Sequence, residues 1–206
     1  MKIDGGLGVE SGFDGIKESC QQQEELGYDG LWVPETSHDP FTMLPLMAEA
    51  TENVELGTGI VVGFARNPMD LAYSANDIQL ISKGRFTLGL GSQIKPHITK
   101  RFSMEWSKPA ARMREMILAT KAIWNSWNTG EKLDFRGDFY QHTLMTPFFD
   151  PGENPYGPPR MALAGVGPLM TEVAGETCDV FLAHGFTTEK YLREETIPAL
   201  ERGAER

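Results

Sequence analysis

The sequence predicts an α/β protein in which helices wrap a parallel β-sheet. Short apolar runs alternate with segments of helical spacing, six times along the 206 residues. The apolar runs are almost continuously hydrophobic, which is typical of parallel strands covered on both faces. Glycine and polar residues follow these runs directly, where strands of one parallel sheet would end together. Such units form either an open doubly wound sheet or a (β/α)8 barrel, and these observations leave both open.

The first three units lie between residues 2 and 82. The expected strands are KIDGGLG (2–8), GYDGLWV (27–33) and VELGTGIVVGFARNP (54–68). A helix follows SGFD (11–14), which resembles a capping box, and continues to about Leu26. Asp39-Pro40 can cap and open a helix over about 41–52, and Asn67-Pro68 repeats this device for a helix to about Ser82.

The other three expected strands are RFTLGLG (85–91), RMALAG (160–165) and CDVFLAH (178–184). Helices are expected over about 108–128, from Gly167-Pro168 to about Glu176, and over 188–203. Residues 130–159 interrupt the alternation, because they are rich in Gly, Pro and aromatic residues. We interpret them as an excursion packed against a single domain, 1–206, with a small β-hairpin as one option.

The composition argues against several classes of function, namely binding of nucleic acid, anionic lipid or metal and insertion into a membrane. The chain has 19 basic and 29 acidic residues and a net charge of -10, which disfavours contact with nucleic acid or anionic lipid. No apolar run approaches the ~20 residues of a membrane helix, and the N-terminus lacks a hydrophobic signal region. Cys20 and Cys178 are far apart without CxxC spacing, so no metal site is expected. We expect a soluble cytoplasmic protein.

Two glycines, Gly57 and Gly59, interrupt the third apolar run, although glycine weakens a strand. Two later turns could bind an anion. LGLGSQ offers Gly89, Gly91 and the hydroxyl of Ser92, and AGVGPLM places Gly165 and Gly167 before a helix with free N–H groups. Ordinary turn chemistry explains these glycines as well. Neither turn matches a P-loop or the GxGxxG fingerprint.

Glu35 and His38, after the second strand, could serve proton transfer. In the alternative interpretation, Asp39 caps the following helix and His38 is a solvated loop residue. Arg66 could contact a charged ligand or an acidic neighbour. His97, His142 and His184 are scattered, and no Ser-His-Asp constellation can be built from the sequence.

Several motifs in order resemble the luciferase-like monooxygenase superfamily, and within it the deazaflavin F420-dependent oxidoreductases. They are GYDGLWVPETSHDPF, LGTGIVV, ARNPMDLAYSANDIQLISKGRFTLGLGSQ, RMREMILATKAIW, GEKLDFRGDFY and AGVGPLMTEVAGETCDVFLAH. The resemblance implies a (β/α)8 TIM barrel with a cofactor ring over the carboxyl end of strand three. It also implies a bulge there, with a non-prolyl cis peptide at Gly59–Ile60. The implied cofactor is F420, with FMN and O2 chemistry as the alternative, since both groups share these motifs.

The resemblance also implies site residues. The acidic residue that contacts the deazaflavin falls on Glu35, and the histidine often beside it falls on Thr36, with His38 two residues later. Cofactor contacts fall on Gly59, Ile60, Val62, Gly91, Ser92, Gln93, His97, Gly165, Val166, Gly167, Leu169 and Met170. Ile94 stands where sugar-phosphate dehydrogenases of this branch carry a catalytic glutamate, so we do not expect glucose-6-phosphate oxidation.

The chain has about six strand–helix units where the family has eight, so we expect an incomplete barrel. A truncated gene, proteolysis of a longer chain, and pairing between subunits would each explain this. The expected enzyme transfers a hydride between F420 and a small organic substrate and forms a homo-oligomer, most simply a dimer. The remaining alternative is a shortened, non-catalytic relative that binds a flavin-like ligand or nothing.

Overall fold

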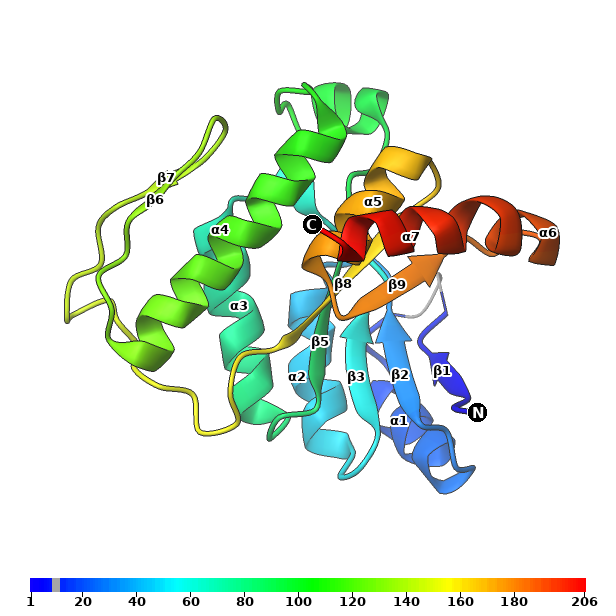
Figure 1. Ribbon diagram of the computed structural model, residues 1–206. Helices are drawn as coiled ribbons and strands as arrows, with labels where there is room; N and C mark the ends of the chain where they lie inside the picture. Colours follow the sequence, from blue (N-terminus) through cyan, green and yellow to red (C-terminus); the bar gives the residue numbers. More distant parts are fainter. Residues whose placement is uncertain (9–11) are drawn as a thin grey trace.

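The computed structural model describes residues 1–8 and 12–206 (Figure 1). Ser11 of the expected capping box lies outside these residues. The first helix, α1 (Ile16–Glu25), follows Gly15, which has a left-handed backbone and provides no side-chain cap. Most other element boundaries fall within a few residues of those expected, because hydrophobic spacing, Asx-Pro pairs and glycine mark them in the sequence.

One parallel sheet forms the centre of the molecule. Its strands are β1 (Asp4–Gly6), β2 (Gly30–Val33), β3 (Glu55–Thr58), β4 (Val61–Val62), β5 (Phe86–Gly91), β8 (Arg160–Gly165) and β9 (Val180–Ala183). They lie in the order β1-β2-β3-β5-β8-β9, with β4 also on β5, and every pairing is parallel. Consecutive units are therefore neighbours, as in a barrel, whereas a doubly wound sheet reverses direction at a switch point.

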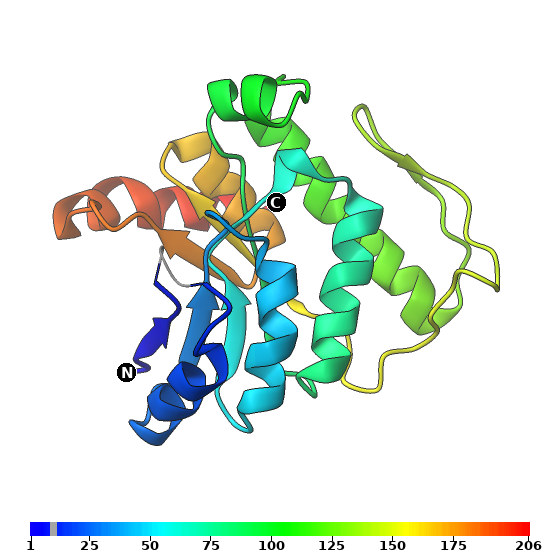
Figure 2. The same cartoon turned by 180° about the vertical axis from the view of Figure 1, so that it is seen from behind.

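The sheet curls into an open arc, with helices along its convex side (Figures 1 and 2). These helices are α1, α2 (Pro40–Ala50), α3 (Pro68–Ile81), α4 (Pro109–Thr129) and α5 (Pro168–Thr177). The arc confirms the predicted incomplete barrel of strand–helix units. At the end of the chain, α6 (Glu189–Tyr191), the π-helical turn η3 (Leu192–Thr196) and α7 (Ile197–Ala204) form one interrupted helix beside α5.

Two helix starts follow the predicted cap-then-proline device. The Asp39 carboxylate accepts the Phe41 N–H at 3.0 Å, with Pro40 as the first residue of α2. Asn67 Oδ1 accepts the N–H groups of Met69 at 2.9 Å and Asp70 at 3.1 Å, directly before α3. These caps satisfy N–H groups that have no partner inside the helix, so they fix where the chain leaves each strand and turns back.

The hairpin of the interrupting segment lies on the far side of α4 from the sheet, and the rest of the segment returns past α3 to β8 (Figures 1 and 2). It contains a two-stranded antiparallel hairpin, β6 (Phe135–Arg136) with β7 (Gln141–His142). The Glu115 carboxylate on α4 accepts the backbone N–H groups of Asp138, Phe139 and Tyr140, at 2.9, 2.7 and 2.5 Å. One side chain of the barrel layer therefore anchors the hairpin loop.

Candidate functional site

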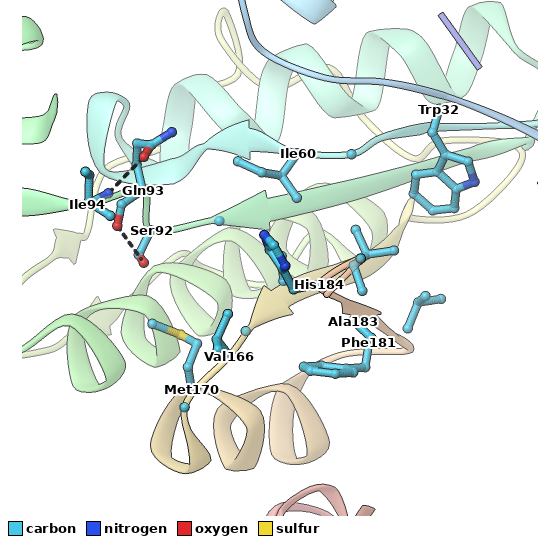
Figure 3. Close-up of a pocket in the computed structure, with 18 of the residues that line it drawn as sticks. Trp32, Ile60, Ser92, Gln93, Ile94, Val166, Met170, Phe181, Ala183 and His184 are labelled. Atoms are coloured by element: carbon cyan, nitrogen blue, oxygen red, sulfur yellow. Dashed lines mark hydrogen bonds between the residues drawn. The ribbon is translucent and has the colours of Figure 1, made fainter. Parts of the chain in front are cut away.

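A cavity of about 1030 Å³ opens on the concave side of the arc (Figure 3). It is lined by Asp4, Trp32, Gly59, Ile60, Gly91, Ser92, Gln93, Ile94, Ala164, Gly165, Val166, Gly167, Met170, Val180, Phe181, Leu182, Ala183, His184 and Gly185. Strands β1, β2, β5, β8 and β9 and the link between β3 and β4 contribute to it, and most of the lining comes from strand ends and the turns that follow. This is the face where (β/α) barrels carry their active sites.

The third strand breaks where it borders this cavity. β3 ends at Thr58, the Gly59–Ile60 peptide bond is cis, and β4 resumes at Val61. The Thr58 hydroxyl bridges the break, because Oγ1 accepts the Gly89 N–H and donates to the Gly89 carbonyl, each at 2.8 Å. Gly59, Ile60 and Gly91 together form a surface at the cavity, which we name the glycine shelf.

Close packing explains which positions here must be glycine. A Cβ on Gly57 would lie 2.4 Å from the Trp32 indole, and one on Gly89 would lie 2.0 Å from the Thr58 carbonyl oxygen. A Cβ on Gly91 would meet the Ile60 side chain at 2.8 Å. At Gly59 the closest atom would be Trp32 Cβ at 3.5 Å, an ordinary contact. Gly57 therefore makes room for Trp32, while Gly59 carries the cis bond at the cavity wall.

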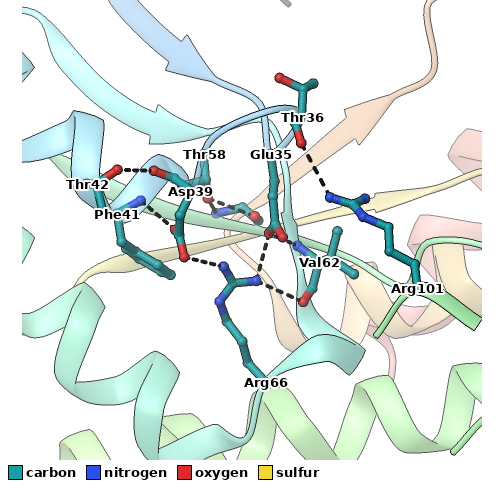
Figure 4. A network of polar contacts seen from close by, with 10 residues as sticks. Glu35, Thr36, Asp39, Phe41, Thr42, Thr58, Val62, Arg66 and Arg101 are labelled. Carbon is teal, nitrogen blue, oxygen red and sulfur yellow. Dashed lines mark hydrogen bonds and ion pairs between the residues drawn. The ribbon is translucent and has the colours of Figure 1, made fainter. Parts of the chain in front are cut away.

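Glu35 forms hydrogen bonds to the backbone directly after the break in the third strand (Figure 4). Its backbone N–H donates to the Ile60 carbonyl at 3.0 Å, and its Oε2 accepts the Val62 N–H at 2.9 Å. The same Oε2 lies 2.7 Å from Arg66 Nη1, and Arg66 Nη2 lies 2.8 Å from the Asp39 carboxylate. The side chain of Glu35 is only 7% exposed and that of Arg66 is 16% exposed. Arg66 thus contacts acidic neighbours, one of the two interpretations that the sequence left open.

Two turns form the upper rim. After β5, Ser92 Oγ donates to the Gln93 carbonyl at 3.1 Å, and Gln93 has a positive φ of 58°. After β8, Gly167 precedes α5 with extended backbone and provides no side-chain cap. Val166 and Leu169 are mostly exposed there. The first N–H groups of a helix have no intrahelical partner, so this start offers backbone donors beside the cavity.

The sequence profile of the luciferase-like monooxygenases matches residues 1–206. The chain belongs to this family. An uncharacterized protein of Mycobacterium tuberculosis is 49% identical over 206 residues, covering 100% of this chain and 60% of that protein. The F420-dependent glucose-6-phosphate dehydrogenase of Amycolatopsis mediterranei is 28% identical over 204 residues, covering 92% of this chain and 59% of the enzyme. The chain thus spans about 60% of the length of these curated relatives.

Solved structures show the same fold. The coenzyme F420-dependent tetrahydromethanopterin reductase of Methanopyrus kandleri superposes with a TM-score of 0.79 at 19% identity, covering 99% of this chain and 61% of that one. A monooxygenase of Streptomyces bottropensis gives 0.82 at 22% identity, covering 100% of this chain and 66% of that one. This luciferase-like chain therefore shares the fold of the corresponding part of these two structures, and its cis bond lies where the resemblance predicted it.

Nine of the predicted site residues line the cavity of this luciferase-like chain. They are Gly59, Ile60, Gly91, Ser92, Gln93, Gly165, Val166, Gly167 and Met170. They come together because they follow strands β3, β5 and β8, which are neighbours in the sheet. Their contacts with a cofactor stay a prediction.

The other five predicted residues do not line it. The Glu35 carboxylate accepts the Val62 N–H next to the break in the third strand. Val62 itself is fully buried in the core. The His38 ring packs edge-on against Phe13, with ring centroids 4.9 Å apart. His97 is exposed and opens a π-helical turn (His97–Arg101), and Leu169 is 67% exposed on α5.

Three polar lining residues were not predicted. Trp32 Nε1 donates to Asp4 Oδ2 at 3.0 Å, which joins β2 to β1 at the cavity, and His184 follows β9. Strand periodicity could have found His184, because it lies two residues after Leu182 and shares its face. Gly57 could have indicated Trp32, because a glycine within a strand often makes room for a bulky ring on the neighbouring strand.

No helix in the described ranges, 1–8 and 12–206, is long and apolar enough to cross a membrane.

Proposed function

We propose that this chain forms the cofactor-binding part of an F420-dependent oxidoreductase, which transfers a hydride between the deazaflavin and a small organic substrate. The single observation that carries the proposal is the glycine shelf at the wall of a large cavity. A flat ring needs a backbone-rich surface beneath it, and a side chain at position 91 would displace Ile60, which lines that space. Deazaflavin supplies the hydride chemistry when it is bound, and the protein supplies placement and electrostatics.

The lining fits such a group in two further ways. Val166 and Met170 are apolar neighbours for an aromatic ring system, and Figure 3 shows both beside the rim. The Gly167 turn provides backbone N–H groups at a helix start, which suits the phosphate of the cofactor's arm. A Cβ on Gly167 would meet nothing within 4 Å, so space exists beside this backbone.

We assign Glu35 and Arg66 to holding the shelf. The bonds from Glu35 to Ile60 and Val62 fix the backbone on both sides of Val61, directly after the cis bond, and Arg66 fixes the carboxylate. Proton transfer by Glu35 or His38, and ring contact by Val62, His97 and Leu169, stay predictions from the resemblance. The named F420-dependent relatives support F420 over FMN.

Titration calorimetry with F420 and with FMN tests the proposal. We expect micromolar binding of F420 and weaker binding of FMN. The reverse result would favour a flavin monooxygenase, and a folded protein that binds neither would favour the non-catalytic relative. A type II Baeyer-Villiger monooxygenase solved with FMN has a TM-score of 0.69 with this chain, which is why FMN is the competing ligand.

The rim is tested by Gly167→Asp. Aspartate is a good N-cap, so the variant should fold at least as well as wild type. Its charge should repel the cofactor phosphate and weaken F420 binding about tenfold. The matched control is Gly167→Ala, which adds a Cβ without charge. The deazaflavin head without its phosphate arm should bind both variants equally, and equal F420 affinities for both would contradict the rim assignment.

A further inference from the structure

We propose that His184 donates a hydrogen bond from Nε2 to the carbonyl oxygen of the substrate. The substrate class would then be carbonyl compounds with a hydrocarbon body. This rests on the proposed function for its chemistry, since hydride addition needs a carbon that a polarised oxygen makes electrophilic. The position of His184 itself rests on contacts within this chain.

The direction of His184 follows from β9. A Cβ built on Gly89 would lie 3.2 Å from Leu182 Cδ1, so the Leu182 side chain reaches across the concave side toward β5. Side chains two residues apart on a strand point to the same face. His184 comes directly after the end of β9, two residues beyond Leu182, and lines the same cavity as Gly91 at the end of β5. Figure 3 shows its imidazole pointing into the cavity between β9 and the glycine shelf.

One ring nitrogen of His184 is held by the turn that follows. Nδ1 accepts the backbone N–H of Phe186 at 3.2 Å, and the Phe186 ring lies beside the imidazole with centroids 5.3 Å apart. A neutral imidazole that accepts at Nδ1 carries its proton on Nε2. Within the described part of the chain, Nε2 has no hydrogen-bond partner. The geometry thus presents a donor, rather than a base, to whatever lies over the shelf.

The surroundings of this donor define the ligand. Val180, Leu182 and the Trp32 indole provide apolar surface in the same cavity. The Asp4 carboxylate, also at the cavity, is already paired with Trp32 Nε1 at 3.0 Å. A ligand with an acceptor oxygen on a hydrocarbon body matches both the donor and the apolar lining. Its oxygen would accept the hydrogen bond of His184 Nε2, and its hydrocarbon part would contact the apolar side chains. In a hydride addition from reduced F420 to the substrate carbon, a neutral imidazole in this place would stabilise the negative charge that develops on the oxygen, until the product takes up a proton from water.

The test uses cyclohex-2-en-1-one as probe and compares His184→Gln with His184→Leu. Gln retains an N–H donor, whereas Leu retains only bulk. Binding is followed by ¹⁵N spectra of the labelled histidine rings, in the free protein and with F420 bound. We expect the His184 Nε2 signal to report a protonated nitrogen and to shift on adding the enone. We expect the enone affinity to fall about tenfold in His184→Leu and to stay within about threefold in His184→Gln.

A kinetic measurement completes the design. With reduced F420 and the enone, KM should rise and kcat fall in His184→Leu, and His184→Gln should recover much of both. Unchanged enone affinity in His184→Leu, or a spectrum with the proton on Nδ1, would overturn the assignment. F420 affinity should be the same in all three proteins. Failure of wild type to bind F420 would instead refute the proposed function, while the enone titration of the free protein would still decide the role of His184.

Discussion

At the scale of the residue, the Glu35 carboxylate is fixed by long-range partners. Its Oε2 binds the Val62 N–H and Arg66, which are 27 and 31 residues away in sequence. Removing one partner of a mostly buried ion pair leaves the other charge without compensation. Asp39, the second carboxylate on Arg66, is by contrast 47% exposed on its side chain.

We therefore expect Glu35→Gln to lower the free energy of unfolding by about 3 kcal/mol. Asp39→Asn should cost less than about 1 kcal/mol, because the asparagine still caps α2 and the lost pair is partly solvated. Urea denaturation of both variants measures the difference. Equal losses would show that Glu35 is not the residue on which the broken strand depends.

Gly57 offers a second test at this scale. An alanine Cβ would lie 2.4 Å from the Trp32 ring, so the indole must move away from its place against Gly57 of β3. We expect Gly57→Ala to destabilise the fold by about 2 kcal/mol, as measured by thermal or urea unfolding. Gly167→Ala is the control, since its Cβ meets nothing within 4 Å, and its cost should stay below about 1 kcal/mol, from the weaker N-cap that alanine provides. A harmless Gly57→Ala would mean that Trp32 is not fixed in this position.

At the scale of the element, Glu24 of α1 connects its helix to the start of β3. Its carboxylate accepts the N–H groups of Glu52, Asn53 and Val54, at distances between 2.6 and 3.1 Å. Burial alone would raise the pKa of Glu24, but these backbone donors and Arg85 outweigh it and lower the pKa below 4.5. The charged form is therefore the one that the folded state prefers.

Because the folded pKa is depressed, this stabilisation is present above the unfolded pKa and is lost as the pH falls below about 4.5. Glu24→Gln should cost about 2 kcal/mol at neutral pH, from weakened charge-assisted hydrogen bonds. The difference from wild type should shrink in acid, when Glu24 itself becomes protonated. Urea midpoints measured from pH 7 to pH 3 give the comparison, and a gap that stays constant with pH would contradict this role.

At the scale of the whole molecule, the arc has two ends. Among the described residues, β1 pairs only with β2, and β9 pairs only with β8. Unpaired strand edges present N–H and C=O groups in a row and promote pairing with another chain. The residues of β9 are half-buried or exposed, so its surface is also partly apolar and uncovered.

We expect this chain, prepared alone, to self-associate. Light scattering should give at least twice the chain mass of 22.9 kDa at micromolar concentration. Hydrogen exchange should slow at β9 amides as concentration rises, because pairing there would protect them. A monomer whose β9 exchange does not depend on concentration would contradict this expectation.

The sequence by itself determined the order of the elements, and its family motifs implied the barrel class. Near-continuous apolar strands, Asx-Pro caps and turn glycines are local signals, and they act within a few residues. The motifs also placed the break at Gly59–Ile60 and brought nine predicted residues to one cavity, because strand ends of a parallel sheet share one face.

Only the tertiary structure decided which side chains face that cavity. Glu35 is turned toward Val62 and Arg66, whereas Trp32 and His184 line the cavity although they were not among the predicted site residues. The physical reason is that a side chain's direction near a strand end depends on partners brought together by the curl of the sheet. Those partners are far apart in the chain, so the spacing of residues in the sequence does not show which of them a polar side chain will bind.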